Sequence, residues 1–373
     1  KTRTGGEKMT EKKDGIYFIG CDMHKEYSNF AVLDGRGKVV SQVRLPHDGE
    51  SLELFYRSLP PGSEVAVEAS RGWYWMIDLI EECGHVPHLV HAGKAKAMMG
   101  HIHKTDKLDS VGLGKLLYLG SLPTVWIPPG EIRDVRELLR VRMGFSRVRT
   151  SVKNQIHAQL GKWGVRVSDV SDLFGISGRE KVKEVLDRVP RESRHGIEMR
   201  LSFLSAVESH MEEIEKRLWE VVKEDHRMKL LQTIPGVGKV LSVVICYEMG
   251  DVERFPSAGK FSSYCGLVPR VRSSGGKTFY GRTPKASKRI LKWAFVEAAT
   301  VVGRWAKSWS HLKVARDYLK IKSQKGHGIA AVAVARRLAC SAWWVLKKEE
   351  PYRNAVRPGG ELRELRESYE ARG

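Results

Sequence analysis

Apolar residues come in short runs along the first part of the chain, and polar or turn-forming residues separate the runs. This pattern predicts strands at 16–22, 28–34 and 38–45, with a turn at Asp34–Gly37 between the last two. Further along, it predicts a strand that ends at Glu68, a helix over 71–83, a strand over 86–91 and helical segments to about residue 120. We therefore expect an α/β domain here.

Long helices are predicted beyond this domain. Prolines and a glycine between 123 and 130 interrupt the chain, which predicts a domain boundary. Apolar residues then recur every three or four positions from Ile132 to Ile156 and again from Leu201 to Val221. Two helices with such stripes would form an antiparallel hairpin or a coiled-coil arm. The same stripes could instead pack against a second subunit.

A third region begins near His226 and contains the segment Ile234-Pro-Gly-Val-Gly238 between two helical patterns. This segment is typical of a helix-hairpin-helix turn. Gly236 and Gly238 would let a DNA backbone approach closely, and amides at the start of the next helix, at Lys239, could hold a phosphate. An ordinary turn between two helices is the alternative.

Composition narrows the class of partner. The net charge is +20 and the pI about 9.7, which favours a polyanion, most simply nucleic acid. A membrane surface is the weaker alternative, because no apolar run approaches the roughly 18 residues of a spanning helix. The five cysteines are scattered without metal-site spacing, which is typical of a reduced, cytoplasmic protein. Basic residues also gather on the first long helix, where they could contact nucleic acid or form a solvated face: Arg136, Arg140, Arg142, Arg147, Arg149 and Lys153.

Four acids near the N-terminus are candidate metal ligands. Asp22 and Glu68 each close a predicted strand, and Asp106 and Asp109 form a D-x-x-D pair. At the start of a helix, this spacing would place both aspartates on one face. Carboxylate oxygens suit Mg²⁺, and two such ions can stabilise the attacking and leaving oxygens of a phosphoryl transfer. Solvated surface acids and helix caps are the alternative.

A basic stretch over 269–296 contains no acid and has Ser273, Ser274 and two glycines at its centre. Thr283 followed by Pro284 predicts the start of a helix. A serine needs a base, a metal or dense positive charge to act as a nucleophile, and no histidine lies nearby in sequence. A phosphate-binding or linker loop is therefore the alternative. The tryptophans Trp73, Trp75, Trp343 and Trp344 are interpreted as packing residues rather than base-stacking ones.

Taken in order, these segments resemble one family. The matching pieces are G-C-D-M-H-K at 20–25, V-E-A-S at 67–70, K-T-D-K-L-D at 104–109, I-P-G-V-G at 234–238, F-P-S-A-G-K-F-S-S-Y-C-G-L-V-P at 255–269 with the following R-S-S-G-G, and K-G-H-G-I-A-A-V-A-V-A-R-R-L-A at 325–339. Together they are similar to the DEDD transposases of bacterial insertion sequences, a group that includes Piv-type DNA invertases and bridge-RNA-guided serine recombinases. The resemblance runs from about residue 16 to 345.

The resemblance implies a fold of α/β plus α type. A flexible tail over 1–15 precedes a RuvC-like, ribonuclease H-like catalytic domain over 16–130. A helical coiled-coil region over 131–225 and a mainly helical transposase domain over 226–355, with the helix-hairpin-helix-like turn and the serine loop, would follow. A charged tail over 356–373 completes the chain.

The resemblance also implies site residues. Asp22, Glu68, Asp106 and Asp109 would bind Mg²⁺, and Ser274 would be the nucleophile, with Ser273 as runner-up. The expected nucleic-acid-binding residues are Gly236, Gly238, Lys239, Arg270, Arg272, Lys277, Arg282 and Lys285. A glycine-asparagine pair common in the family is replaced by Ala286-Ser287 here, which bears on the contacts of the following helix.

The activity implied is cutting and rejoining of donor and target double-stranded DNA through a serine–phosphate linkage. A dimer or tetramer would act in the bacterial cytoplasm, at the nucleoid, with no membrane partner, and a structured guide RNA would select the DNA sites. A protein-guided invertase, a metal-dependent junction nuclease that uses water, and a non-catalytic nucleic-acid adaptor are the alternatives.

Overall fold

A computed structural model describes residues 15–100, 106–168, 170–274, 277–281, 283–284 and 287–354, without the side chains of 106–108, 272, 274, 277, 278 and 280. The two predicted tails lie outside these residues, apart from Gly15. The chain forms two compact units, Lys1–Pro128 and Pro129–Gly373.

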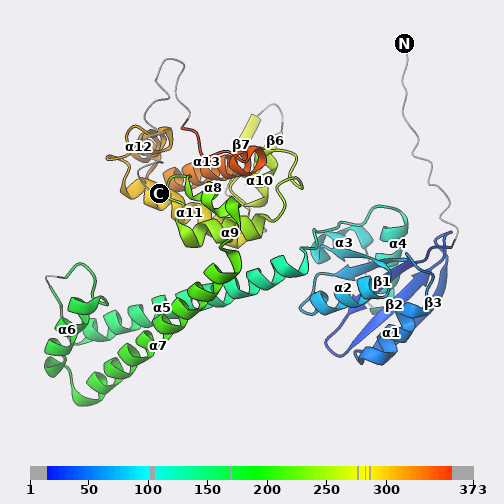
Figure 1. Cartoon of the computed structure of the whole chain (residues 1–373), viewed down its shortest axis with the longest axis horizontal. Helices are drawn as coiled ribbons and strands as arrows, with labels where there is room; N and C mark the ends of the chain where they lie inside the picture. The colour runs from blue at the N-terminus through cyan, green and yellow to red at the C-terminus, as the bar shows by residue number, and fades with distance from the viewer. Residues whose placement is uncertain are drawn as a thin grey trace, which may run out of the picture. The chain divides into compact units, whose positions relative to one another are not determined.

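Unit 1 is built on a five-stranded sheet with the order β3-β2-β1-β4-β5 (Figure 1). The strands are β1 (Phe18–Met23), β2 (Tyr27–Leu33), β3 (Val39–Pro46), β4 (Glu64–Glu68) and β5 (Val86–Val90). β1, β2 and β3 are antiparallel neighbours, whereas β4 and β5 continue the sheet in parallel with β1. This mixed sheet confirms the predicted α/β domain, and the predicted strands agree with it to within a few residues.

Helices cover both faces of this sheet. Ile19 and Val65 point to the face packed by α1 (Gly49–Arg57) and α2 (Trp73–Glu82). Gly20 and Ala66 alternate with them and belong to the opposite face, which α3 (Ala92–Met99) and α4 (Asp106–Tyr118) cover. Each strand of the centre is therefore buried on both sides, which explains its nearly continuous apolar sequence.

Unit 2 begins with two long helices, α5 (Gly130–Lys162) and α7 (Arg191–Val222), that lie side by side (Figure 1). They run antiparallel, because Val135 near the start of α5 shares a core with Val222 at the end of α7, whereas Ile156 shares one with Ile197. The helix α6 (Ile176–Val185) and a short 3₁₀ turn (Leu186–Arg188) lie between them in sequence. The predicted antiparallel hairpin is confirmed; coiled-coil packing stays a prediction.

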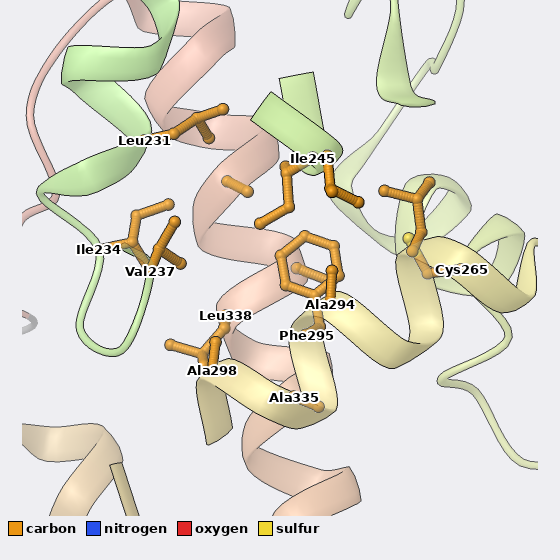
Figure 2. Packing of buried hydrophobic residues seen from close by; sticks show 14 of the residues in the cluster. Leu231, Ile234, Val237, Ile245, Cys265, Ala294, Phe295, Ala298, Ala335 and Leu338 are labelled. Carbon is orange, nitrogen blue, oxygen red and sulfur yellow. The ribbon is translucent and has the colours of Figure 1, made fainter. Parts of the chain in front are cut away.

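The rest of unit 2 packs around one large apolar core, part of which Figure 2 shows. Phe295 and Ala298 from α11 meet Leu338 from α13 there, with Ile234 and Ile245 nearby. The elements are α8 (His226–Gln232), α9 (Lys239–Met249), α10 (Ala258–Tyr264), β6 (Val271–Ser274), β7 (Lys277–Tyr280), α11 (Arg289–Arg304), α12 (Lys313–Lys325) and α13 (His327–Lys348).

The helix α13 is apolar and long enough to cross a membrane by length and composition alone. The sequence predicts no apolar run close to the length of a membrane-spanning helix, and this helix is an exception to that prediction. In the structure its apolar residues form part of the core, as Ala335, Leu338 and Ala342 are fully buried. Such a helix is typical of the centre of a helical domain, and it is weak evidence for a membrane partner.

Two local predictions for the basic stretch need correction. The helix predicted to open at Thr283-Pro284 begins instead at Arg289, with Lys288 as its N-cap. The hydroxyl of Thr283 accepts a hydrogen bond from Lys292 Nζ at 2.6 Å, so it does not act as the cap. The serine segment, expected as a loop, forms the antiparallel hairpin β6–β7.

Candidate active site and nucleic-acid interface

The proposed metal ligands Asp22 and Glu68 end two neighbouring strands. The register of β1 and β4 pairs Gly20 with Ala66 and Cys21 with Val67, so Asp22 and Glu68 come at the same level one residue later. Adjacent strands lie about 4.8 Å apart, and alternation puts both acids on the α4 face. Asp22 is 9% exposed and Glu68 is half-buried. The two acids therefore lie at the same end of neighbouring strands, on the face of the sheet that α4 covers.

The helix α4 brings the other two acids to the same end of the sheet. Tyr118, the last residue of α4, stacks edge-on against Phe18 at the start of β1, with ring centroids 5.4 Å apart. Ser110 and Gly114 face Gly20 in the middle of the strand. The helix thus runs antiparallel to β1, and its first turns, with Asp106 and Asp109, lie toward the end of β1 that carries Asp22.

Gly20 makes this approach possible. A Cβ at Gly20 would lie 1.9 Å from the carbonyl oxygen of Ser110 and 2.6 Å from the backbone nitrogen of Gly114. Both distances are far below van der Waals contact, so any side chain at residue 20 would push α4 away from the strand. The glycine in G-C-D therefore positions the acid-bearing helix.

The donor set at this edge suits a hard cation. Carboxylate oxygens from two strand ends and one helix are the ligands that Mg²⁺ prefers. Burial raises the pKa of Cys21 to about 12, so this neighbouring thiol stays protonated and is a poor ligand. Among the described side chains no group of three or more His, Cys, Asp or Glu forms a metal cluster, and the side chain of Asp106 is outside that set. His24 Nε2 lies 3.2 Å from Asp22 Oδ2.

The turn between α8 and α9 contains the two glycines singled out above. Gly236 has a φ of +82°, and a Cβ there would lie 2.2 Å from the carbonyl oxygen of Ala298 in α11. Gly238 is the N-cap of α9, with extended backbone, and no atom lies within 4 Å of the position of its Cβ. Gly236 thus serves the packing of the turn, whereas Gly238 and Lys239 are exposed and leave the start of α9 open to a ligand.

The serine hairpin has a fixed register. Ser274 pairs with Lys277, Ser273 with Thr278 and Arg272 with Phe279. Since residues alternate between the two faces of a strand and paired residues share a face, positions 272, 274, 277 and 279 belong to one face of the hairpin. Positions 273 and 278 belong to the other. Arg270, just before β6, accepts a hydrogen bond from Gly281 N at its carbonyl, 2.7 Å away. Arg282 and Lys285 lie outside the described residues.

Sequence reasoning missed a buried acid, Glu248 in α9, which is 0% exposed. Three cations surround its carboxylate, two from α5 and one from the N-cap of α11. Lys288 Nζ lies 3.1 Å from Oε2, Arg136 Nε lies 3.7 Å from Oε2, and Arg140 Nη2 lies 3.9 Å from Oε1. A lone acid in the apolar helix V-L-S-V-V-I-C-Y-E-M was the signal that could have found it.

The side chain of Arg136 also caps the C-terminal end of α9, the helix that carries Glu248. Its Nε and Nη2 donate to the carbonyl oxygens of Tyr247 and Glu248, at 2.9 Å and 3.1 Å. Burial lowers the pKa of Arg136, and the nearby Glu248 carboxylate opposes this effect. Arg136 therefore links α5 to the end of α9, and Lys288 links the N-cap of α11 to the same carboxylate.

Other basic residues of α5 also form ion pairs with acids of unit 2. Arg142 Nη2 lies 2.7 Å from Glu215 Oε1, and Lys153 Nζ lies 3.4 Å from Glu208 Oε1, both across the α5–α7 pair. Of the six basic residues, four thus contact acids inside unit 2. These four therefore have partners within the protein, and nucleic-acid contact stays a prediction for all six residues.

Two family models match the chain. The model of the DEDD transposases of the IS110 type matches residues 19–163, which include the acid-bearing unit 1 and α5. The model described as "Transposase IS116/IS110/IS902 family" matches residues 228–315, which include the α8–α9 turn and the serine hairpin. The matches thus cover the two groups of candidate site residues separately.

Known proteins match over nearly the whole chain. A probable family 20 transposase of Pseudomonas aeruginosa is 26% identical over 347 residues, 90% of this chain and 98% of that protein. The transposase for insertion sequence element IS1328 of Yersinia enterocolitica is 26% identical, over 88% of this chain and 96% of that protein. The transposase for insertion sequence element IS1111A of Coxiella burnetii is 24% identical over 93% and 94%. The ordered motifs, the sheet with acids at one edge and these matches agree that the chain is a DNA-acting transposase of the IS110 family of insertion sequences.

Proposed function

We propose that this transposase cuts and rejoins DNA through a covalent serine–phosphate linkage, with Ser274 as the nucleophile. The register of β6 and β7 carries this proposal. Ser274 shares its face of the hairpin with positions 272 and 277, an arginine and a lysine, whereas Ser273 belongs to the opposite face. Positive charge around a phosphate is what an unassisted serine needs in order to react.

In the proposed step the oxygen of Ser274 forms a bond to the phosphorus of the scissile phosphodiester. The bond from that phosphorus to one deoxyribose oxygen breaks, and this oxygen leaves with a proton. Attack by a deoxyribose hydroxyl of another strand on the serine phosphodiester reverses the exchange, joins the new strand and returns the proton to serine. No water or external energy source enters, so the number of phosphodiester bonds is conserved.

The carboxylates provide the second half of the proposed site. Proteins with the DEDD motif are typically metal-dependent. Asp22, Glu68, Asp106 and Asp109 would hold Mg²⁺, which stabilises negative charge on phosphate oxygens when it is bound. The common level of Asp22 and Glu68 on one face, together with the direction of α4, supports this ligand set.

Phosphate contacts outside the reacting centre are assigned to the basic residues and to the start of α9. Gly238 and Lys239 are exposed there, and backbone amides at a helix N-terminus bind phosphate. We add Arg270, Arg272, Lys277, Arg282 and Lys285 as the cations of the serine segment. Gly236 contributes through the shape of the turn.

Covalent capture tests the nucleophile. Wild-type protein incubated with donor and target DNA should give a protein–DNA adduct that survives denaturation and yields a phosphoserine-containing peptide over the β6–β7 hairpin. Ser274→Ala should abolish the adduct, and Ser273→Ala, the matched control on the opposite face, should retain it. The reverse result would assign the linkage to Ser273. Products formed by the double variant would support the junction nuclease, which uses water instead of serine.

Calorimetry tests the metal site without relying on turnover. Mg²⁺ titrated into the full chain should give a binding signal that Asp22→Asn removes. Glu64→Gln, a control at the opposite end of β4 from the proposed ligand Glu68, should keep the signal. Equal binding by both variants would refute the assignment of Asp22.

We further propose that a structured RNA encoded beside the transposase gene selects the donor and target sites, and that the protein works as a dimer or tetramer at the chromosome in the cytoplasm. The +20 charge supports a large nucleic-acid contact area. Sequencing the RNA that co-purifies with the protein from cells should give one discrete species. Recovery of random cellular RNA alone would favour a protein-guided invertase.

A further inference from the structure

A cavity lies beside the edge of the sheet that carries Asp22, on the opposite face from α4. Its volume is about 420 Å³, and it is lined by Lys25, His47, Gly49, Leu52, Trp75 and Leu79. Lys25 follows Asp22 by three residues in the turn from β1 to β2, and His47 directly follows β3. The cavity therefore lies next to the proposed catalytic edge within the same unit.

Trp75 gives the cavity an aromatic wall. Its side chain is 41% exposed, although it belongs to α2, whose next residues Met76 and Ile77 are fully buried. The interpretation of the tryptophans as packing residues is confirmed for Trp343, which is buried and donates from Nε1 to Phe255 O at 3.1 Å, and it stays a prediction for Trp75. Exposure of a large ring at a cavity wall leaves its face available to a flat partner.

His47 is held in place by both ring nitrogens. Nε2 lies 2.8 Å from Ser28 Oγ, and Nδ1 lies 3.3 Å from the carbonyl oxygen of Lys25. The imidazole meets the Trp75 indole edge-on, with ring centroids 5.0 Å apart and an interplanar angle of 73°. The indole also lies against Gly72, which leaves room for it because a Cβ there would be 2.9 Å from Trp75 Nε1. The two rings thus form a fixed corner.

The side chains around this corner match one class of ligand. Leu79 supplies apolar contact above the buried Leu52, the two rings supply flat surfaces, and Lys25 is the charged side chain among the described lining residues. A flat heteroaromatic group linked to a phosphate needs this combination, and base–aromatic stacking is the usual way in which proteins hold unpaired nucleotides. The volume lies in the range of small-molecule sites and admits one nucleotide.

We propose that this cavity binds one unpaired nucleotide of the DNA or RNA on which the transposase acts, with the base stacked on Trp75 and the phosphate near Lys25. A strand that continues from there around the end of β1 would bring its neighbouring phosphates to the edge of the sheet that carries Asp22. The site would thus fix the strand in register with the carboxylates. Its occupation requires neither the serine chemistry nor a metal.

Binding measurements on the full chain test the proposal. Fluorescence anisotropy without divalent metal would compare labelled single-stranded DNA, single-stranded RNA and fully paired duplex. Trp75→Ala should weaken binding of at least one single-stranded probe by about tenfold or more, whereas Trp75→Phe should restore most of the affinity. Whether DNA or RNA shows the loss identifies the source of the nucleotide.

The chain offers a matched control. Trp163, at the end of α5, is 47% exposed, so Trp163→Ala removes a similarly exposed indole far along the sequence. We expect it to bind like wild type. Equal losses in both tryptophan variants, or wild-type binding by Trp75→Ala, would overturn the proposal.

Photocrosslinking gives a second readout that does not depend on the stability of a variant. Probes with one halogenated uracil, bound to the wild-type protein, should crosslink to the peptide that contains Trp75. Lys25→Ala should reduce the yield. Crosslinks only to peptides of unit 2 would refute the site, and they would leave the proposed serine chemistry untouched because no cleavage is measured.

Discussion

Lys288 and Glu248 form a partly buried ion pair, with 3.1 Å between Nζ and Oε2, that joins the N-cap of α11 to the end of α9. Lys288 follows the serine hairpin by eight residues in sequence, and Glu248 is fully buried. Arg136 brings α5 to the same carboxylate. One acid thus fixes three elements of unit 2, including the exit of the segment that carries the proposed nucleophile.

We expect Glu248→Gln to be strongly destabilising. Loss of the carboxylate would leave Arg136 buried without its counter-charge, and breaking a buried ion pair typically costs about 3–5 kcal/mol. Denaturant unfolding measures the change in free energy. Glu220→Gln, which removes an exposed acid paired with Arg217, should change stability by less than about 1 kcal/mol. Similar values for the two variants would contradict the role assigned to Glu248.

Gly20→Ala should separate α4 from the sheet. The new Cβ would meet the backbone of Ser110 and Gly114, neither of which can rotate away. We expect a loss of about 2 kcal/mol or more in stability, together with loss of strand cleavage, because the first turns of α4 carry two of the proposed ligands. Gly161→Ala, near the end of α5 with no atom within 4 Å of the new Cβ, is the control and should lose neither stability nor cleavage.

The two glycines of the α8–α9 turn should respond differently to alanine. Gly236→Ala introduces a side chain at a φ of +82° and 2.2 Å from Ala298 O, so the thermal midpoint of unfolding should fall. Gly238→Ala has room and an ordinary φ, so the midpoint should fall less, by no more than the modest cost of replacing a glycine N-cap. If phosphate contacts the amides at the start of α9, Gly238→Ala should still weaken duplex DNA binding. Unchanged DNA affinity would show that this turn is structural alone.

Acid should weaken the cap of α8. Asp225 is the N-cap, and its carboxylate accepts hydrogen bonds from Arg227 Nε and Nη2 at 2.9 Å and 2.7 Å. Burial alone would raise the pKa of Asp225, but the hydrogen bonds and charge of Arg227 outweigh burial and lower it.

A lowered pKa in the folded state stabilises the fold above the ordinary aspartate value, and this contribution disappears as pH falls through the lowered pKa. Asp225→Asn should therefore reduce stability by about 1 kcal/mol at pH 7, and progressively less as the pH falls below about 3.9, the ordinary pKa of aspartate. Unfolding free energies measured from pH 7 down to about pH 3 check this. A constant difference between wild type and variant across this range would contradict the predicted linkage.

Sequence patterns were sufficient for most of the sheet. Strands such as 28–34 are apolar runs between turn residues, and a central strand buried on both faces needs such a run. The helix α1 was not identified, although Asp48 caps it and Glu53 pairs with Arg57 four residues later. Those cues lie in a short, mostly polar helix, for which periodicity is weak.

The serine hairpin and the helix after it were harder to predict. The strand β6, Val271–Ser274, has only four residues, too few for alternation to stand out. Thr283-Pro284 is a good local start for a helix, but a tertiary contact decided otherwise, since Lys288 N bonds to Tyr264 O and Thr283 bonds to Lys292. The local preference of a sequence for a helix start is overridden when residues distant in sequence form hydrogen bonds with the same groups.

The partners of the arm cations could not be predicted at all. Arg142 and Glu215 are separated by 73 residues, and only the antiparallel register of α5 and α7 brings them together. Basic residues on a helix give the same sequence pattern whether they meet acids of the same chain or phosphates of DNA. The acids at 22 and 68 were easier, because neighbouring parallel strands end at one edge.

At Gly20 the strand and the helix α4 meet main chain to main chain, with no side chain between them. The distance between the acid of β1 and those of α4 is consequently set by contact between two backbone segments. Insertions in the loops between the intervening strands and helices would leave this distance intact, whereas one methyl group at residue 20 would not. Related enzymes should therefore tolerate large differences in loop length, but no added side-chain carbon at the position of Gly20.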